Sequence, residues 1–415
     1  MDADIVVVGA GAAGLWAAAA AARGGRRVLV LEKTARAGTK ILASGGTRCN
    51  LTTTLGPAAA ARLFGDAEPF LLPALRALTP AAVRARFHAL GVPTVTEDAL
   101  EKVFPKSQRA VDVRDALLRD ATDAGAQEQP AAAEDRAAGL DRPAVTGGGD
   151  PLHRGLVAEP GAGGQSYPKT GTTGDGYGWL RDLDLPVVRP VPALVPLASR
   201  APWVTALSGI ALPDVEARLQ DPSERVVARR KRPVLFTHHG ISGPGAMDLS
   251  VHAARAAASG GTDGWHVALD LLPDRGLDDL RAELLDAAGR PGGPRLARLV
   301  GHRMPARVLE AVVRQAGLSD DNPALHQVDR KSRNRLCDAL KGLRVPLSGT
   351  LGWDEAEVTG GGLSLEAVDR ATLEVHGRPG LHVFGELLDL TGPIGGLNFQ
   401  AAFATAELAA RAALS

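Results

Sequence analysis

The stretch Ile5-Val6-Val7-Val8-Gly9-Ala10-Gly11-Ala12-Ala13-Gly14 near the N-terminus decides the fold of this chain. Its apolar residues predict a buried strand, and the alanine-rich segment from Leu15 to Ala22 predicts a helix directly after the glycines. A G-x-G-x-x-G turn between a strand and a helix lets the backbone approach a pyrophosphate, which the positive end of the helix dipole stabilises. The residues of this turn that we expect to contact a dinucleotide are Gly9, Gly11, Ala13 and Gly14.

The next apolar segment, from Arg26 to Glu32, predicts the second strand of a βαβ unit. Glu32 ends this strand about 20 residues beyond the glycines, where an acid binds a ribose hydroxyl. An acid at this position favours a ribose without a phosphate group. The unit therefore predicts FAD rather than FMN, with the pyrophosphate on the glycine turn and the adenosine ribose on Glu32.

The composition limits the class of protein. A chain of 415 residues is long for a single core, so two or more domains are expected. Lys and Arg number 47, as do Asp and Glu, so the net charge indicates neither an acidic nor a basic partner. The absence of a targeting segment and of an apolar run near ~20 residues predicts a soluble, cytoplasmic protein without a membrane partner. The two cysteines form no C-x-x-C pair and the histidines are scattered, so neither a dithiol relay nor a metal site is expected.

The periodicity changes along the chain. Between Gln127 and Pro160 the strand signal is lost, and we expect an irregular stretch there. Short strand-like runs between positions 186 and 271 predict a β subdomain, and helical patterns from 278 to 342 predict an α subdomain. A buried strand and a helix return near the C-terminus. The first and last segments are therefore expected to form one nucleotide-binding domain, with the middle inserted into it.

A loop rich in glycine and hydroxyl groups, Gly38 to Asn50, follows the βαβ unit. Placed after Glu32, it can fold over an extended dinucleotide. Lys40 or Arg48 is then expected to face a phosphate or the electron-rich end of a flavin.

A second Gly-rich block, Gly392 to Gln400, opens the last helix. A helix N-terminus at this place would stabilise negative charge on a reduced flavin ring. The residues expected to hold the ring are Gly395, Gly396 and Asn398, and Glu386 is expected to reach the ribityl or phosphate region.

With these motifs the chain resembles the BaiN/RdsA-like (YhiN-like) family of NAD(P)/FAD-dependent oxidoreductases. The matching elements cover both ends and the middle of the chain in the family's order. Besides the glycine turn and Glu32, they are Lys40 to Asn50, Gly164 to Pro168 with Gly171, Gly174 and Gly176, Phe236 to Pro244, Thr359 to Gly362, and Gly385 to Gln400.

The resemblance implies an α/β fold, with a discontinuous Rossmann-like FAD-binding domain and an inserted β-barrel plus helical subdomain. The expected parts are residues 1–190 and 349–415 for the FAD-binding domain and 191–348 for the insert. Beyond the residues already named, the implied cofactor site includes Lys33, Ser44, Gly45, Gly46, Asn50, Gly385 and Leu397.

One segment departs from the family pattern. The family has strands before the Gln165 motif, whereas here the residues from Val157 to Gly164 follow the degenerate stretch. If those strands are missing, the sheet beside the adenine half of FAD is incomplete. The affinity for the cofactor would then be reduced.

The resemblance also implies an FAD-dependent reductase of an electron-poor carbon–carbon double bond in a small molecule or a nucleobase. NAD(P)H would be a transient electron donor, because no second G-x-G-x-x-G follows a strand. Cys49 and His238 are the candidate proton donors. The alternative for Cys49 is a small apolar filler, and for His238 a loop-stabilising hydrogen bond.

Two basic runs in the insert, Arg229 to Arg232 and Arg330 to Arg335, leave a second function open. They could follow an RNA backbone, in an RNA- or ribosome-associated flavoprotein that reduces rRNA uridine or binds without turnover. Solvated surface charge is the alternative, and no aromatic residues interleave the runs. A flavin oxidase that uses oxygen is a third possibility. The substrate, the choice between NADH and NADPH, and the oligomeric state are not determined by the sequence.

Overall fold

The computed structural model of the 415-residue chain describes residues 3–97, 101–130, 154–157, 164–290 and 292–415. They fall into two compact units: Met1–Pro192 with Trp353–Ser415, and Ala193–Gly352. The first unit is discontinuous in sequence. The boundaries predicted after residues 190 and 348 lie close to these, and their assignment as functional domains stays a prediction.

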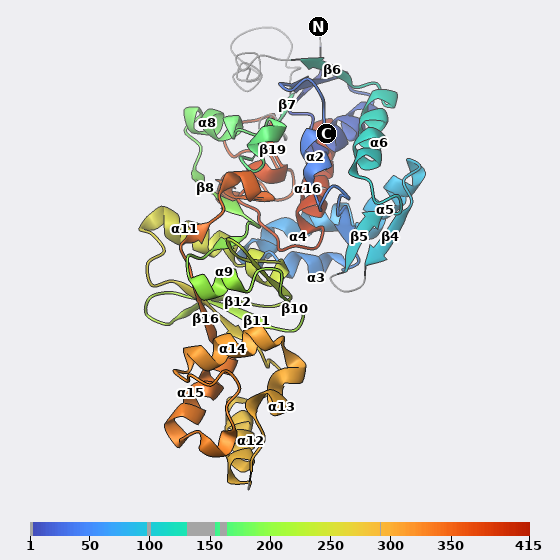
Figure 1. Cartoon of the computed structure of the whole chain (residues 1–415). Coiled ribbons are helices and arrows are strands. Elements are labelled where there is room, and N and C mark those ends of the chain that lie inside the picture. The colour runs from blue at the N-terminus through green and yellow to red at the C-terminus, as the bar shows by residue number, and fades with distance from the viewer. Residues whose placement is uncertain (1–2, 98–100, 131–153, 158–163, 291) are drawn as a thin grey trace. The chain divides into compact units, whose positions relative to one another are not determined.

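The first unit is built on a five-stranded parallel sheet (Figure 1). Its strands, in spatial order, are β19 (Leu381–Val383), β7 (Arg154–Val157), β1 (Ile5–Val8), β2 (Val28–Glu32) and β6 (Gln127–Pro130). Each adjacent pair is parallel, as βαβ crossovers require. The predicted α/β class and the Rossmann-like domain are confirmed.

The expectation of an irregular stretch from Gln127 to Pro160 is wrong at both of its ends, because β6 and β7 belong to the sheet. The strand β6 has the sequence Gln-Glu-Gln-Pro, which carries no strand signal. It lies at the sheet edge, where pairing on one side only tolerates polar residues and a proline. The strand β7 pairs with both β1 and β19, so non-local hydrogen bonds override its weak local propensity. Residues 131–153 and 158–163 lie outside the described part of the chain.

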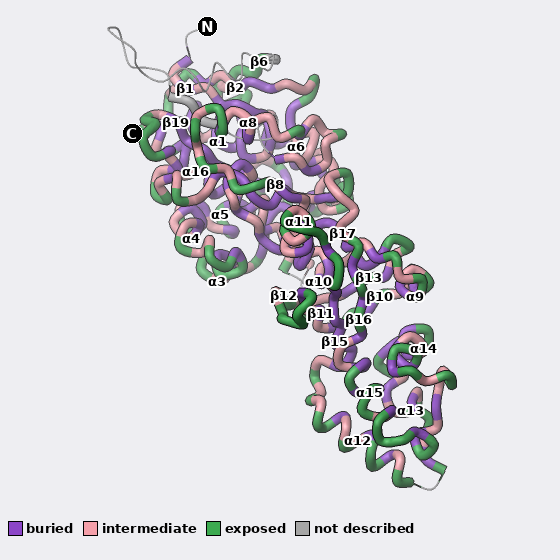
Figure 2. The backbone as a smooth tube through the Cα atoms, turned by 90° about the vertical axis from the view of Figure 1, so that its left-hand side faces the viewer, coloured by how far each residue is buried: buried purple, intermediate pink, exposed green. Residues whose placement is uncertain are grey.

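Alanine-rich helices form the core beside this sheet. The first helix, α1 (Ala12–Arg23), packs along the last, α16 (Leu397–Leu414), since small side chains let the two backbones approach closely. Both helices are mostly buried (Figure 2). At one end of this contact the rings of Trp16 and Phe403 lie 4.9 Å apart, and Phe87 packs against both.

The rest of the first unit surrounds this core. Its further helices are α2 (Thr39–Ala43), α3 (Pro57–Arg62), α4 (Glu68–Ala77), α5 (Pro80–Ala89), α6 (Ala110–Asp123) and α8 (Asp175–Asp182). An antiparallel sheet contains β3 (Thr52–Thr53), β5 (Lys102–Pro105) and β4 (Thr94–Glu97), and a pair contains β18 (Val358–Leu363) and β8 (Val187–Ala193).

The second unit contains two antiparallel sheets. One has the order β10 (Ala211–Leu212), β13 (Val234–Thr237), β14 (Gly240–Ser242), β9 (Leu197–Ala198) and β17 (Gly349–Thr350). The other has the order β12 (Val226–Lys231), β11 (Glu216–Gln220), β15 (His266–Asp270) and β16 (Leu343–Pro346). The β subdomain is thus present, but its described strands form two open sheets where a barrel was expected.

Helices complete the second unit: the last four agree with the helical periodicity between 278 and 342, whereas the first three lie within the stretch predicted as a β subdomain. They are α9 (Pro202–Ala206), α10 (Pro244–Met247), α11 (Ser250–Ser259), α12 (Leu277–Gly289), α13 (Leu296–Val300), α14 (Ala306–Gln315) and α15 (Arg330–Lys341). Their apolar faces share one core with the two sheets, and many of their outer residues are exposed (Figure 2).

A buried glutamine joins three parts of the first unit. Gln400, on the first turn of α16, is fully buried. Its Oε1 accepts a hydrogen bond from Thr52 Oγ1 at 2.6 Å, and its Nε2 donates to the carbonyl oxygen of Leu78 at 2.8 Å. The Gln400 side chain therefore holds two segments against the start of α16. One is β3, through Thr52, and the other is the residue Leu78 just before α5.

We expect Gln400→Leu to lower the free energy of unfolding by about 1–3 kcal/mol, because the Leu78 carbonyl and the Thr52 hydroxyl lose their partner in a buried place. Urea denaturation followed by circular dichroism measures the loss. The control is Gln327→Leu on an exposed turn of the second unit, for which a change within about 0.5 kcal/mol is expected. Equal losses of stability in the two variants would show that the Gln400 hydrogen bonds do not stabilise the fold.

Candidate functional site

The glycine turn has the geometry that a dinucleotide requires. Gly9 adopts a positive φ of 101°, and its N–H donates to the carbonyl oxygen of Leu31 at 2.7 Å. Gly11 is the N-cap of α1, so the N–H groups of the first helical turn have no intrahelical acceptor. These groups are available to an anion at the carboxyl end of β1.

Glu32 closes this turn from the neighbouring strand. Its carboxylate is buried, with 2% of the residue exposed. One oxygen accepts the N–H of Ala10 at 2.8 Å, and the other accepts the N–H and the hydroxyl of Thr34 at 2.8 and 2.9 Å. A carboxylate accepts about four hydrogen bonds, so the three described here leave one acceptor site for a ribose hydroxyl.

Glu386 is the centre of a second polar cluster. Its carboxylate forms an ion pair with Lys40, and both side chains are nearly buried, at 12% and 14% exposed. The carboxylate also accepts the N–H of Thr359 at 2.6 Å and the hydroxyl of Ser166 at 3.0 Å. A Cβ at Gly164 would lie against this carboxylate, at 2.4 Å. The cluster thus brings together four motifs that are far apart in sequence.

The loop between Ser44 and Asn50 has an unusual backbone. Gly45, Gly46, Thr47 and Cys49 all have positive φ, between 54° and 69°. Such conformations cost energy for residues other than glycine and persist where the surroundings enforce them, often at functional sites. The N–H of Cys49 donates to the carbonyl oxygen of Ser44 at 3.1 Å, which closes the loop on itself.

The Cys49 thiol is completely buried. Burial raises its pKa to about 12, and a hydrogen bond with Ser44 offsets only part of this rise. The thiol therefore keeps its proton at neutral pH.

Arg48 is engaged elsewhere. Its guanidinium forms an ion pair with Glu97 at 2.6 Å, donates to Gln108 at 3.0 Å, and lies 4.1 Å from the centre of the Phe104 ring. The side chain is thus held against β4 and β5. Lys33 is likewise paired, with Asp175 of α8 at 2.8 Å. Cofactor contacts for Arg48 and Lys33 stay predictions.

The start of α16, which we call the cradle, packs its backbone directly against the Asn50–Thr52 segment. Gly396, its N-cap, has a φ of 77°, and a Cβ there would lie 2.2 Å from the carbonyl oxygen of Thr52 and 2.8 Å from Asn50 Oδ1. This Asn50 oxygen is buried and has no hydrogen-bond partner in the described structure. A buried acceptor without a donor beside a side-chain-free turn fits a planar ligand that carries an N–H group.

Asn398 has a different primary role from the one expected. Its Oδ1 accepts the N–H of Gly392 at 2.8 Å, and its Nδ2 donates to the carbonyl oxygen of the same residue at 2.9 Å. The amide therefore closes the loop that carries Gly395 and Gly396. A direct contact of Asn398 with the flavin ring stays a prediction, as does that of Leu397, the first residue of α16. Gly385, with a φ of 72°, is fixed through its N–H to Thr405 Oγ1 at 3.1 Å.

His238 belongs to the second unit, whereas Cys49 belongs to the first. It occupies the exposed turn between β13 and β14, where its ring centre lies 4.1 Å from that of His239. The structure thus places the two candidate proton donors in separate environments, one buried and one solvated.

Sequence reasoning missed several residues that organise the site. Ser166 and Thr359 lie within the motifs named above, so their hydroxyl groups beside glycines were the available signal. Thr52 and Gln400 carried no signal of their pairing, because their hydrogen bond joins positions 348 residues apart.

Within the described ranges, no three metal-ligating side chains converge, and no helix combines the length and the apolar character of a membrane span.

Comparison with known families decides the assignment. Residues 3–412 match the model of the HI0933-like protein Rossmann domain. The chain belongs to the HI0933-like family. It is therefore a flavin-dependent oxidoreductase with a Rossmann-like FAD-binding domain, and the predicted family is confirmed.

Two curated relatives span nearly the whole HI0933-like chain. It is 30% identical to the ribosomal RNA dihydrouridine synthase of Escherichia coli, over 97% of this chain and 96% of that protein. It is 28% identical to the 3-dehydro-bile acid delta(4,6)-reductase of Clostridium scindens, over 99% and 98%. The solved 3-ketosteroid delta1-dehydrogenase of Sterolibacterium denitrificans has a TM-score of 0.50 and 13% identity over 99% of both chains, which shows similarity of fold alone.

We expect Lys40→Met to lower the free energy of unfolding by about 2–4 kcal/mol, because it leaves the Glu386 carboxylate nearly buried without its cation. The double variant Lys40→Met/Glu386→Gln should lose less than the sum of the single losses, since a neutral amide needs no counter-charge. Urea denaturation of the four proteins gives the coupling energy. Strictly additive losses would show that the pair is not coupled.

Proposed function

We propose that the protein is an FAD-dependent reductase that takes a hydride from NAD(P)H and saturates an electron-poor carbon–carbon double bond. The observation that carries this proposal is the cradle at Gly396, where the buried Asn50 oxygen has no partner, in the same unit as the glycine turn of α1. The names of two relatives support the reaction class: both a dihydrouridine synthase and a bile acid delta(4,6)-reductase convert a double bond to a single one.

When bound, FAD supplies the site that accepts and passes on the hydride. The chain's own residues bind and orient it. The first-turn N–H groups of α1 and the backbone of Gly11 suit the pyrophosphate, and Glu32 suits the adenosine ribose. The N-terminus of α16 would stabilise negative charge at the ring, with Asn50 accepting a hydrogen bond.

Cys49 stays the proposed proton donor to the substrate carbon, and its complete burial in the apolar core keeps the alternative of a small apolar filler open. A general acid must be protonated at the working pH, and burial holds the pKa of this thiol at about 12. The loop that carries Cys49 follows α2 directly. Lys40, the partner of Glu386, lies on α2, so one continuous segment carries both the thiol and the cation of the Glu386 cluster. The exposed His238 is the competing donor.

A nucleobase in RNA is the second candidate substrate. The second unit has 22 Lys and Arg against 17 Asp and Glu over residues 193–352, whereas the whole chain is balanced. The run from Arg229 to Arg232 is largely neutralised, since Lys231 pairs with Asp274 and Arg232 with Asp248. The run from Arg330 to Arg335 forms no ion pair in the described structure, although Arg333 donates to the carbonyl oxygen of Val328 and Arg335 donates to Ser332 Oγ at 2.9 Å, so this run is the better candidate for meeting phosphates.

We expect Gly11→Val to abolish FAD retention. Gly11 has a φ of −85° and a ψ of −168°, which valine adopts readily, so the backbone conformation does not oppose the substitution and the added side chain is expected to exclude the pyrophosphate. Absorbance near 450 nm of the purified protein measures the bound flavin. The control is Gly289→Val at the end of α12, where an added Cβ would meet no atom of another element within 4 Å. Full flavin content in the Gly11 variant would remove the glycine turn from the cofactor site.

The reductase proposal is tested by anaerobic stopped-flow measurement of the two half-reactions. NAD(P)H should bleach the flavin equally in wild type and Cys49→Ala, because a thiol that donates to substrate has no part in flavin reduction. Reoxidation by an enone or a uridine-containing RNA should slow by ~10²-fold in Cys49→Ala. His238→Ala is the comparison variant. Unchanged reoxidation in both variants would leave solvent as the acid.

Other results would contradict the reductase itself. A colourless protein that retards RNA would show a binding function, and fast release of peroxide in air would show an oxidase. Flavin that dithionite bleaches but NAD(P)H does not would exclude the proposed donor.

A further inference from the structure

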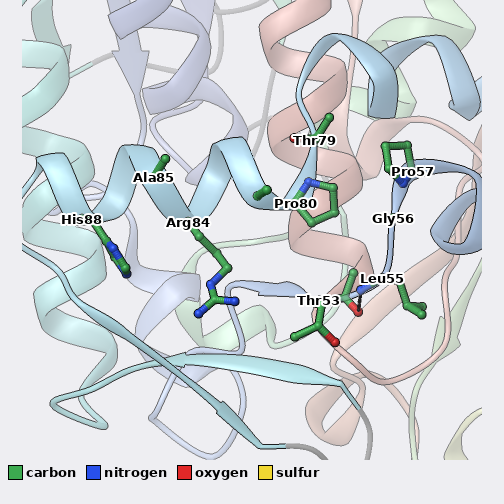
Figure 3. A pocket seen from close by; sticks show the side chains of 11 residues that line it. Thr53, Leu55, Gly56, Pro57, Thr79, Pro80, Arg84, Ala85 and His88 are labelled. Atoms are coloured by element: carbon green, nitrogen blue, oxygen red, sulfur yellow. Dashed lines mark hydrogen bonds between the residues drawn. The ribbon is translucent and has the colours of Figure 1, made fainter.

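A pocket of about 430 Å³ opens between β3, the start of α3 and the start of α5 in the first unit (Figure 3). Its walls combine hydroxyl groups of Thr53 and Thr79 with apolar surface from Leu55 and Pro80. Arg84 and His88 extend from successive turns of α5 along the same wall. None of the eleven lining residues is acidic, so the pocket is suited to an anion. Its volume is in the range of sites for small ligands.

Arg84 supplies the charge. Its Nε donates to Thr94 Oγ1 at 3.2 Å, which orients the guanidinium. No carboxylate of the described residues lies within ion-pair distance of it, in contrast to Arg86 two positions on, which pairs with Asp120 at 2.7 Å. A partly buried arginine whose outer nitrogens lack an acid is a ready partner for a phosphate.

Two threonines add donors that the protein does not use. Thr53 is 1% exposed, and its hydroxyl accepts the N–H of Leu55 at 3.3 Å. The Thr79 hydroxyl accepts the N–H of Ala82 at 3.1 Å as the cap of α5. A hydroxyl group that accepts a hydrogen bond can still donate its own proton. No hydrogen bond donated by the Thr53 or the Thr79 hydroxyl is found among the described residues, so both protons can be donated to a ligand. The ten-residue helix α5 also points its positive end at the pocket.

The pocket is connected to the start of α16 through residues that precede two of its lining residues. Thr52, whose carbonyl oxygen borders Gly396, immediately precedes the lining residue Thr53. Leu78, whose carbonyl oxygen is held by Gln400, immediately precedes the lining residue Thr79. Both pocket walls are therefore fixed to the first turn of α16, the helix that begins at the cradle.

We propose that this pocket binds the adenosine-phosphate end of the nicotinamide dinucleotide donor, with Arg84 contacting its phosphate. This inference rests on the proposed function, because that function requires a mobile dinucleotide to visit the flavin. The apolar wall of Leu55 and Pro80 suits a ribose or a base, and the donors suit the phosphate. The chain has no second G-x-G-x-x-G after a strand, so an anion pocket connected to the start of α16 supplies the missing site.

The test measures binding and reduction separately on the flavin-loaded protein. Titration calorimetry with ADP-ribose and with 2′,5′-ADP should show binding to wild type that weakens about tenfold or more in Arg84→Gln, since one charge-assisted contact is lost. Arg84→Lys should recover part of the affinity. Ala85→Trp should block the pocket by volume alone, because Ala85 is exposed and lines it. The control is Arg76→Gln, an exposed arginine of α4 outside the pocket.

In stopped flow, Arg84→Gln should raise the NAD(P)H concentration for half-maximal flavin reduction about tenfold and leave the limiting rate unchanged. Equal affinities and equal half-saturation in wild type, Arg84→Gln and Ala85→Trp would overturn the inference and leave the reductase intact. Loss of RNA binding in Arg84→Gln without loss of ADP-ribose binding would overturn it in favour of a phosphodiester site. A wild-type flavin that NAD(P)H does not bleach would instead refute the proposed function.

Discussion

The Glu386 carboxylate is the interaction on which the rest of the cofactor site depends. It is nearly buried, so its charge must be balanced locally, and the partners come from Lys40, Ser166 and Thr359. Each belongs to a different segment of the chain. A buried carboxylate that loses a donor retains its full desolvation cost, which strongly favours the one arrangement in which all four segments meet. The requirement to satisfy one acid thus positions the loop after β2, the Gly164 segment and β18 around the start of the last helix.

A second buried side chain plays the same role with neutral chemistry. Gln400 uses both ends of its amide, and its partners Thr52 and Leu78 come from the chain between β2 and α5. Together Glu386 and Gln400 hold the two ends of the Gly385–Gln400 block against the rest of the first unit. The glycines between them then need no side chains for anchoring. At Gly392 and Gly396 the backbone packs directly against Phe64 and Thr52, so a side chain at either position would have no space.

The sequence predicted the parts of the fold whose signals are local. The first βαβ unit was correct because strand, turn, helix and acid follow one another within Ile5 to Glu32. The strands β6 and β7 could not be found in this way, since Gln127–Pro130 and Arg154–Val157 are strands only through their pairing with β2 and β1. The strand propensity of a short segment carries no information about hydrogen bonds to strands that are distant in sequence.

The same distinction applies to the candidate site. The motifs name the candidate loops, but the partners of each side chain within a loop are set by three-dimensional packing. Arg48 was expected to face the cofactor, yet its guanidinium is held by Glu97 and Gln108. Asn398 was expected at the flavin ring, yet its amide closes a loop on Gly392. The type and position of a polar residue indicate that it belongs to the site. Whether its side chain contacts a ligand or stabilises the loop depends on its distances to the neighbouring groups, which the sequence does not contain.

The burial of Cys49 shows how such a loop can serve chemistry. In the unfolded chain a thiol with an ordinary pKa near 9 would lose its proton above that pH, whereas the folded thiol keeps it up to about 12. Between these values the unfolded state binds fewer protons than the folded state, so stability falls as pH rises, and below pH 9 the burial has no such effect. At neutral pH the protein therefore holds a protonated thiol with no cost from this linkage. The positive φ values at Thr47 and Cys49 show that the surrounding structure holds this loop in a backbone conformation that costs energy.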